Sequence, residues 1–175
     1  MKKIRGIFLL LLCMILVGCN KDEFSNTLGN CTIDKCVELI DPSDSVSKIN
    51  EILGIDGVLV DAGYNEYFWE LSENAGIYVT YYSGDVGIIR SEFPDEEIKN
   101  SRVSFAKINE IESAVNTDES LTYQDLVNML GNVEGVTVEK SESELKYKWV
   151  SDDNKYLIAT ISQDTKKCIM ITGMY

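Results

Sequence analysis

SVSKINEILG at positions 45–54 and TYQDLVNMLG at positions 122–131 are the two stretches that decide the fold. Each carries apolar residues at the spacing of one helix face and ends in a glycine, which commonly closes a helix in the left-handed conformation. The hydroxyls of Ser45 and Thr122 stand where they can cap the first free amides, and Asp125 completes a capping box with Thr122. We therefore predict two capped amphipathic helices in equivalent places.

The residues around these helices repeat in the same order. After each glycine the apolar period changes from 3.6 to 2, which is typical of strands, and Trp69 and Trp149 occupy matching positions 80 residues apart. Turns and further strands follow both tryptophans, and a shorter apolar stripe precedes each helix. The pattern predicts an α+β protein of two tandem repeats, each a helix pair packed on a three- to four-stranded antiparallel sheet.

Composition divides the chain into five segments. The stretch FPDEEIKNSR is charged and contains one of only two prolines, which is typical of a linker. The residues directly after Cys19 are mostly polar, which is typical of a flexible tether. The predicted segments are a lipoprotein signal peptide (1–18), a lipidated cysteine with a flexible tether (19–30), a first α+β repeat (31–92), the linker (93–102) and a second α+β repeat (103–175).

The amino-terminal residues have the layout of a secretory leader. Three basic residues precede an apolar stretch over 7–17, and Leu16, Val17 and Gly18 stand directly before Cys19. This run resembles the lipobox of bacterial lipoproteins, in which the cysteine thiol receives a diacylglyceryl group. The resemblance implies a lipid anchor at Cys19 on the extracytoplasmic side of the cell membrane. A retained anchor helix is the alternative, although a spanning helix needs about 20 apolar residues.

The strongly acidic composition excludes one class of partner. The chain has 16 Lys and Arg against 29 Asp and Glu, for a net charge of −13. Cleavage of the leader removes three basic residues and no acidic ones, which lowers the charge to −16. Nucleic acid is therefore not an expected partner, because phosphate binding depends on clustered Lys and Arg. The same charge repels anionic headgroups, so we expect the folded part to stand away from the membrane surface.

The cysteines leave two interpretations open. Beyond Cys19 the chain has Cys31, Cys36 and Cys168, an odd number, so at least one thiol has no partner within the chain. Cys36 lies on an apolar helix stripe and Cys168 begins an apolar strand, which favours small buried side chains. A disulfide between Cys31 and Cys36 is the alternative. Three scattered thiols without histidine do not match zinc spacings, and we expect no metal or cofactor.

The first repeat offers candidate binding residues on one sheet face. If Trp69 faces the helices, then Glu66, Phe68 and Glu70 point outward by strand alternation, and the next strand presents Tyr78 and Tyr82 on alternating positions. Aromatic side chains on a solvated face indicate a protein interface, since binding energy concentrates on such residues. Ordinary cross-strand pairing, which stabilises a sheet without any partner, is the alternative interpretation.

Catalytic patterns are weak in this sequence. The chain has no histidine, which removes the commonest general base and the usual partner of a serine or cysteine nucleophile. Glu66 and Glu70 are four residues apart on one strand face, the kind of carboxylate pair that hydrolyses glycosides. With 29 acidic residues in the chain, such a pair arises readily by chance. We therefore expect a protein that is not an enzyme.

Three segments carry a resemblance to a known family. VSFAKINEI at 103–111, LTYQDLV at 121–127 and the Leu-Gly at 130–131 resemble the secreted β-lactamase inhibitory proteins and related small lipoproteins of Gram-positive bacteria. A more distant resemblance is to the small lipoproteins of outer-membrane assembly complexes. In the inhibitors, two sheets form a concave surface that holds a partner protein, and a disulfide closes each repeat. The second repeat here has only Cys168, so we transfer no inhibitory residue.

The sequence therefore predicts a lipid-anchored extracytoplasmic module that binds a protein or belongs to an envelope complex. Its expected partners are membrane lipid through Cys19 and an envelope or secreted protein. The alternative is a lipoprotein that binds a small molecule or a cell-wall fragment in the cleft between the repeats.

Overall fold

The computed structural model describes residues 32–72, 74–82, 86–93, 98, 100–115, 117, 120–153 and 155–174. The leader, Cys19, the tether and Cys31 lie outside these residues, and the predictions about them stay predictions. No helix in the described ranges has the length and apolar character needed to cross a membrane.

Helices and strands alternate in two similar series along the chain. The helices are α1 (Ile33–Leu39), α2 (Val46–Leu53), α3 (Phe105–Val115) and α4 (Tyr123–Met129). The strands are β1 (Val58–Asp61), β2 (Glu66–Ser72), β3 (Ala75–Tyr81), β4 (Gly87–Glu92), β5 (Arg102–Val103), β6 (Val136–Lys140), β7 (Glu144–Ser151), β8 (Tyr156–Ser162) and β9 (Cys168–Met174). We call α1, α2 and β1–β4 the N-terminal half, and α3, α4 and β6–β9 the C-terminal half.

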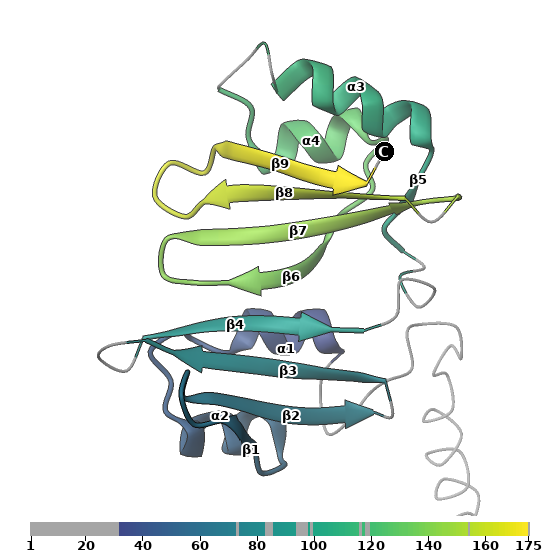
Figure 1. Cartoon of the computed structure of the whole chain (residues 1–175). Helices are drawn as coiled ribbons and strands as arrows, with labels where there is room; N and C mark the ends of the chain where they lie inside the picture. Colours follow the sequence, from purple (N-terminus) through teal and green to yellow (C-terminus); the bar gives the residue numbers. More distant parts are fainter. Residues whose placement is uncertain are drawn as a thin grey trace, which may run out of the picture.

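The fold prediction of helix pairs on two separate small sheets is wrong. The strands form a single, mostly antiparallel sheet of nine, in the order β1-β2-β3-β4-β6-β7-β8-β9 with β5 parallel to β7 (Figure 1). Only four short helices occur among the described residues, so the protein is richer in sheet than predicted. The difference arises where β4 pairs with β6, through Ile89 opposite Lys140 and Arg90 opposite Glu139.

The helices cover one face of this sheet, and each half has its own apolar core. Strand register places Tyr67, Val79, Ile89, Lys140 and Leu145 in one row across the join, so the helix-facing side is continuous. The core of the N-terminal half is built around Trp69 and that of the C-terminal half around Trp149, both fully buried. Burial of a side chain of that size contributes several kcal/mol, about 3–5 by truncation to alanine.

Helix α1 lies across the join between the halves and packs on β3, β4 and β6. The Lys140 ammonium from β6 donates to the carbonyls of Glu38 at 2.8 Å and Ile40 at 2.9 Å, at the carboxyl end of α1. A cation there stabilises the free carbonyls and the negative end of the helix dipole. On the β4 side, the Ser91 hydroxyl donates to the Thr137 carbonyl at 3.3 Å. Polar contacts of long sequence separation therefore support the β4–β6 pairing.

Both predicted helix caps are confirmed. The Ser45 side chain accepts from the Lys48 amide at 3.3 Å, and Thr122 forms a complete capping box with Asp125. Gly54 and Gly131, which follow the two helices, have φ of 72° and 85°, in the left-handed region that glycine adopts at little cost.

The two described cysteines differ in state. Cys36 is fully buried and is part of a disulfide, whose partner lies outside the described residues. Cys168 is a buried free thiol, and burial raises its pKa. The prediction that both side chains are buried is confirmed, and of the two interpretations left open for Cys36 the structure shows the disulfide-bonded state.

Candidate binding surface

The side of β2–β4 that faces away from the helices carries most of the predicted binding residues. In the register of β2 and β3, Glu66 lies opposite Thr80, Phe68 opposite Tyr78, and Glu70 opposite Gly76. Trp69 and Ile77, which alternate with these residues, are fully buried against the helices. The prediction that Glu66, Phe68, Glu70 and Tyr78 share an outward face is therefore confirmed. We call this side of β2–β4 the outer face.

An aromatic pair forms the centre of the outer face. The rings of Phe68 and Tyr78 lie 4.5 Å apart at an interplanar angle of 32°. A Cβ atom at Gly76 would overlap the Phe68 ring, so the ring lies directly over the glycine. Glycine at position 76 thus provides the space in which Phe68 lies flat on the sheet. Both aromatic side chains are partly exposed on this face.

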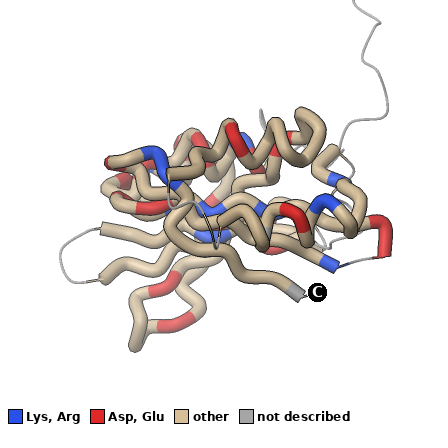
Figure 2. Tube along the Cα trace, turned by 90° about the horizontal axis from the view of Figure 1, so that it is seen from above, with Lys and Arg blue, Asp and Glu red and all other residues tan. Residues whose placement is uncertain are grey.

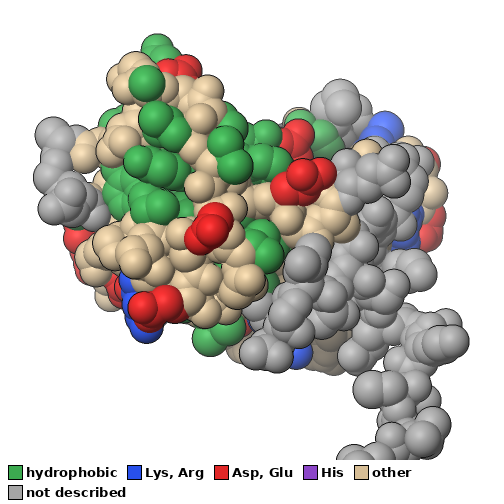
Figure 3. Space-filling view, turned by 90° about the horizontal axis from the view of Figure 1, so that it is seen from below, with side chains coloured by type: hydrophobic (Ala, Val, Ile, Leu, Met, Phe, Trp, Pro, Cys, Tyr) green, Lys and Arg blue, Asp and Glu red, His purple; other side chains and the backbone are tan. Residues whose placement is uncertain are grey.

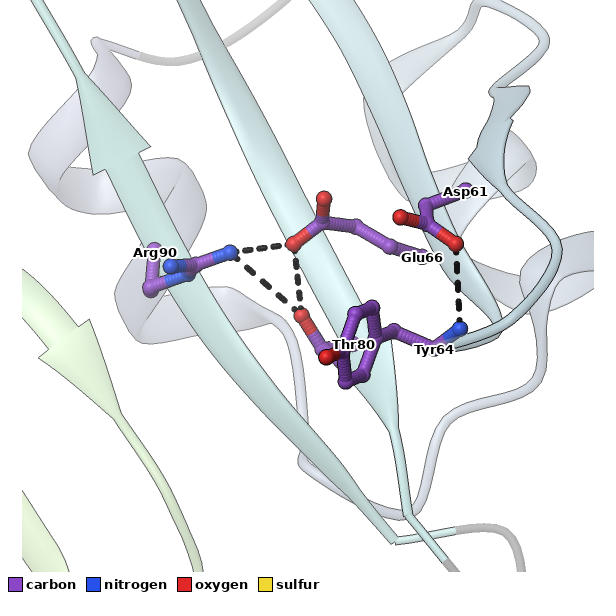
Figure 4. Close-up of polar contacts among 5 residues, drawn as sticks. All are labelled: Asp61, Tyr64, Glu66, Thr80 and Arg90. Atoms are coloured by element: carbon purple, nitrogen blue, oxygen red, sulfur yellow. Dashed lines mark hydrogen bonds and ion pairs between the residues drawn. The ribbon is translucent and has the colours of Figure 1, made fainter.

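A polar network borders the pair (Figure 4). The Arg90 guanidinium forms an ion pair with Glu66, and the Thr80 hydroxyl, which lies between them on β3, donates to the same Glu66 oxygen at 2.8 Å. The Arg90 Cζ atom also lies 5.9 Å from the centre of the Tyr78 ring, within the range of a cation–π contact. The Glu66 carboxylate is therefore engaged by both Arg90 and Thr80 within the sheet.

The electrostatics of Tyr78 agree with this arrangement. Burial, together with the charge of Glu92 and a hydrogen bond to it, raises the pKa of the Tyr78 hydroxyl; the Glu66 charge adds to the rise and Arg90 opposes it. The phenol is consequently protonated at neutral pH and can donate a hydrogen bond. The outer face thus offers a flat aromatic surface bordered by several carboxylates, which suits contact better than proton transfer.

Two shallow hollows flank the aromatic pair. One has a volume of about 480 Å³ and the other about 300 Å³. The first is lined by Phe68, Glu70, Ser72, Asn74, Ala75, Gly76, Glu92 and Phe93, and the second by Tyr78, Arg90, Ser91 and Glu92. Side chains of a partner could enter these hollows on both sides of the rings.

Tyr82 does not join this centre. It follows the last residue of β3 and is 56% exposed. Four residues of extended strand, or about 13 Å, separate it from Tyr78. Tyr82 is therefore at most a peripheral part of the predicted surface.

The apolar edge beside the outer face was not predicted from the sequence. Val58, Leu59 and Val60 in β1 are 63%, 46% and 49% exposed, and Tyr64 in the following turn is 69% exposed. Figure 3, which views the end of the molecule where β1 and β2 lie, shows hydrophobic side chains gathered there with carboxylates around them. Three consecutive apolar residues between Asp56 and Asp61 are the signal that could have indicated this edge.

The same side of the C-terminal half has different chemistry. Lys146 lies in the row of Phe68, Tyr78 and Arg90, and its ammonium is 2.6 Å from the Glu139 carboxylate. The Lys148 ammonium lies 4.9 Å from the centre of the Tyr156 ring. Figure 2 shows acidic and basic positions interspersed along the trace rather than collected into one basic patch.

A third hollow, of about 450 Å³, lies on the join between the halves. Its lining comes from the start of α1, from residues 132–136, and from Phe93, Ile98, Asn100 and Ser101. Thr32 is one of the lining residues, and its hydroxyl oxygen is buried without a hydrogen-bond partner among the described residues. No group of three metal-ligating side chains occurs in the described ranges.

No protein-family model matches the chain, and a comparison with curated proteins finds no match either. The resemblance to the inhibitory proteins therefore stays a prediction.

Proposed function

We propose that the chain is a lipid-anchored, extracytoplasmic protein-binding module that holds an envelope or secreted protein on its outer face. The Phe68–Tyr78 pair is the observation that carries this proposal: two aromatic rings in contact on the helix-free side of the sheet. Aromatic residues of this kind supply much of the energy of protein interfaces. The hollows beside the pair and the Arg90–Glu66 pair would give the surface its specificity.

Crosslinking in intact cells tests this proposal. We expect the native chain to recover an envelope protein in fixed ratio, and Phe68→Ser and Tyr78→Ser to lose it. Thr172→Ala is the matched control, because Thr172 is an exposed residue on the outward side of β9. Circular dichroism of each variant shows whether the fold is intact. Recovery that is unchanged in both serine variants, or no protein in fixed ratio with the native chain, would contradict the proposal.

The anchor has its own test. Mass spectrometry of the mature amino terminus should show a diacylglyceryl group on Cys19, and Cys19→Ala should release the chain from the membrane fraction. A mature chain that keeps an unmodified, uncleaved leader would contradict the lipid anchor and leave the binding surface unaffected.

A second candidate function rests on the hollow at the join. Thr32 presents a buried hydroxyl without a partner among the described residues, which a small polar ligand could satisfy. The test is the thermal unfolding of the full chain with a set of cell-wall muropeptides. Stabilisation by a muropeptide in the native chain that is lost in Thr32→Val would favour this function, whereas no shift with any muropeptide would count against it.

A further inference from the structure

We propose that β1 pairs, as an edge strand, with an extended segment of a protein partner that is rich in lysine or arginine. The inference rests on the proposed function, because the added strand would lie beside the outer face and belong to the same partner. It identifies which element of the partner is recognised and by which chemistry.

β1 forms one edge of the described sheet. Among the described strands, β1 stands at the end of the strand order and pairs with β2 alone. An edge strand presents backbone N–H and C=O groups that can pair with another chain, and proteins commonly protect such edges with lysine, proline or a bulge. β1 has an irregularity in register between Leu59 and Asp61, but its side chains Val58, Leu59 and Val60 are apolar and exposed.

β1 lies next to the aromatic pair of the outer face. Val58 lies opposite Phe68, which lies opposite Tyr78, so the three residues form one row on the outer face. A strand added to β1 would extend this row, and every second side chain of that strand would lie on the same side. Backbone pairing would thus provide affinity, and the row of apolar side chains would provide selection, as in other complexes formed by strand addition.

Charge identifies the partner. Between Lys48 and Arg90 the sequence has no lysine or arginine. The acidic residues of that stretch are Glu51, Asp56, Asp61, Glu66, Glu70, Glu73 and Asp85. Asp56 stands just before β1 and Asp61 ends it, so a second β1 would bring these carboxylates close to their own copies, and two copies of this acidic chain repel one another. A basic segment is attracted instead, which favours a different protein over self-pairing.

The other edge of the sheet provides an internal comparison. Within the part of the chain that the structure describes, β9 likewise pairs with β8 alone, and it carries exposed Ile169 and Met170. Lys166 and Lys167 precede it directly, so its local charge is opposite to that of β1. A basic peptide should therefore select β1 over β9.

Hydrogen exchange of the full chain in detergent micelles, followed by mass spectrometry, tests the inference. The probe is a synthetic octapeptide of alternating lysine and valine, and the control is the same peptide with glutamate in place of lysine. We expect the lysine peptide to slow exchange in β1 but not in β9, an effect that weakens with added salt. Equal protection of β1 and β9, equal protection by both peptides, or no protection of β1 would overturn the inference.

Two variants keep the test independent of folding. Val60 has no partner in the β1–β2 register, so Val60→Pro places a residue that disrupts strand pairing at a position where proline is tolerated. Val60→Lys leaves the backbone intact and adds a like charge facing the probe. Both should abolish protection by the lysine peptide. Sedimentation that shows self-association of the native chain, lost in Val60→Pro, would identify a second copy as the occupant and overturn the choice of partner.

The outcomes also separate this inference from the proposed function. If crosslinking recovers a protein that is lost in Phe68→Ser but retained in Val60→Pro and Val60→Lys, the edge pairing is wrong and the binding surface stands. If crosslinking recovers no protein in fixed ratio, the proposed function itself fails.

Discussion

The N-terminal and C-terminal halves each bury one tryptophan beneath a glycine, but they satisfy its indole N–H in different ways. In the N-terminal half, Asn50 Oδ1 accepts from Trp69 Nε1 at 2.8 Å and from the Gly57 amide at 3.0 Å. In the C-terminal half, the Val133 carbonyl accepts from Trp149 Nε1 at 2.9 Å. One side chain therefore organises the first core, whereas the second relies on backbone.

The amide of the C-terminal glycine has a separate partner. The Gly135 amide donates to the Tyr123 hydroxyl at 3.2 Å, and the Tyr123 ring is stacked on Tyr147 at 4.1 Å. The two tasks that Asn50 performs alone are thus divided in the C-terminal half between a carbonyl and a phenol. A single substitution among these hydrogen-bonding residues should consequently lower the free energy of unfolding more in the N-terminal half than in the C-terminal half.

The largest loss of stability is expected at the two glycines. A Cβ atom at Gly57 would overlap the Trp69 indole, whereas one at Gly135 would lie 2.8 Å from the nearest Trp149 atoms. Because both rings are fully buried and rigid, Gly57→Ala should lower the free energy of unfolding by about 3 kcal/mol and Gly135→Ala by about 1–2 kcal/mol. Urea unfolding followed by tryptophan fluorescence measures both. A larger loss for Gly135→Ala would contradict the comparison.

The next-largest loss of stability is expected for a substitution of Asn50. Asn50→Ala leaves the Trp69 indole and the Gly57 amide without their acceptor, which should cost about 2–3 kcal/mol of unfolding free energy. Asn128→Ala is the matched control, because that amide oxygen is exposed and accepts from the side chain of Gln124 at 3.1 Å. We expect the control to change stability by less than about 0.5 kcal/mol. Similar losses in the two variants would show that the Asn50 hydrogen bonds contribute little.

Part of this architecture was predictable from local patterns. The helix stripes, the Ser45 and Thr122 caps and the tryptophan-centred strands depend on residues within a few positions of each other, which periodicity records. The outward face of β2 and β3 was predictable for the same reason, since alternation places Phe68 and Tyr78 on one side.

The continuous sheet was not predictable, because it depends on backbone pairing between distant residues. Ile89 and Lys140 are 51 positions apart, and alternation in β4 is the same whether that strand is an edge or an interior strand. Arg90 was missed as a surface residue because its ion pair with Glu66 spans β3 and requires the register of three strands. β1 was missed because three consecutive apolar residues have no strand alternation.

A smaller effect is expected for Tyr123→Phe, which removes the acceptor of the Gly135 amide and keeps the ring stack. The loss in unfolding free energy at neutral pH should be about 1 kcal/mol, with Tyr64→Phe, at an exposed turn residue, as the neutral control.

The stability difference between the native chain and Tyr123→Phe should also depend on pH in the alkaline range. Burial is the main cause that raises the pKa of Tyr123 to about 12. The stabilising effect of the neutral phenol is fully present below the unfolded pKa of about 10 and is lost as pH rises toward the folded value. The free energy of unfolding of the native chain should therefore fall between these pH values, and that of Tyr123→Phe should fall by less. Parallel pH profiles would contradict the assignment.

The smallest expected difference lies at the helix caps. Thr122 accepts from the Asp125 amide at 3.3 Å, and the Asp125 carboxylate accepts in return from the Thr122 amide at 2.8 Å. Ser45 makes one cap contact, with the Lys48 amide at 3.3 Å, at an exposed helix start. Thr122→Ala removes the hydroxyl of a reciprocal box and should cost about 1 kcal/mol, whereas Ser45→Ala should cost about 0.5 kcal/mol.

Unfolding in urea measures the stability loss of both cap variants. A third variant, Asp125→Asn, shows how much of the capping-box stability comes from the charge of Asp125. The amide of asparagine keeps an acceptor but lacks the charge that favours a helix amino terminus, so Asp125→Asn should lose less than Thr122→Ala. Here the C-terminal half is the more sensitive one, the reverse of the order at the glycines and at Asn50. A Ser45→Ala loss equal to that of Thr122→Ala would mean that the single hydroxyl contact, and not the reciprocal box, determines cap strength in this protein.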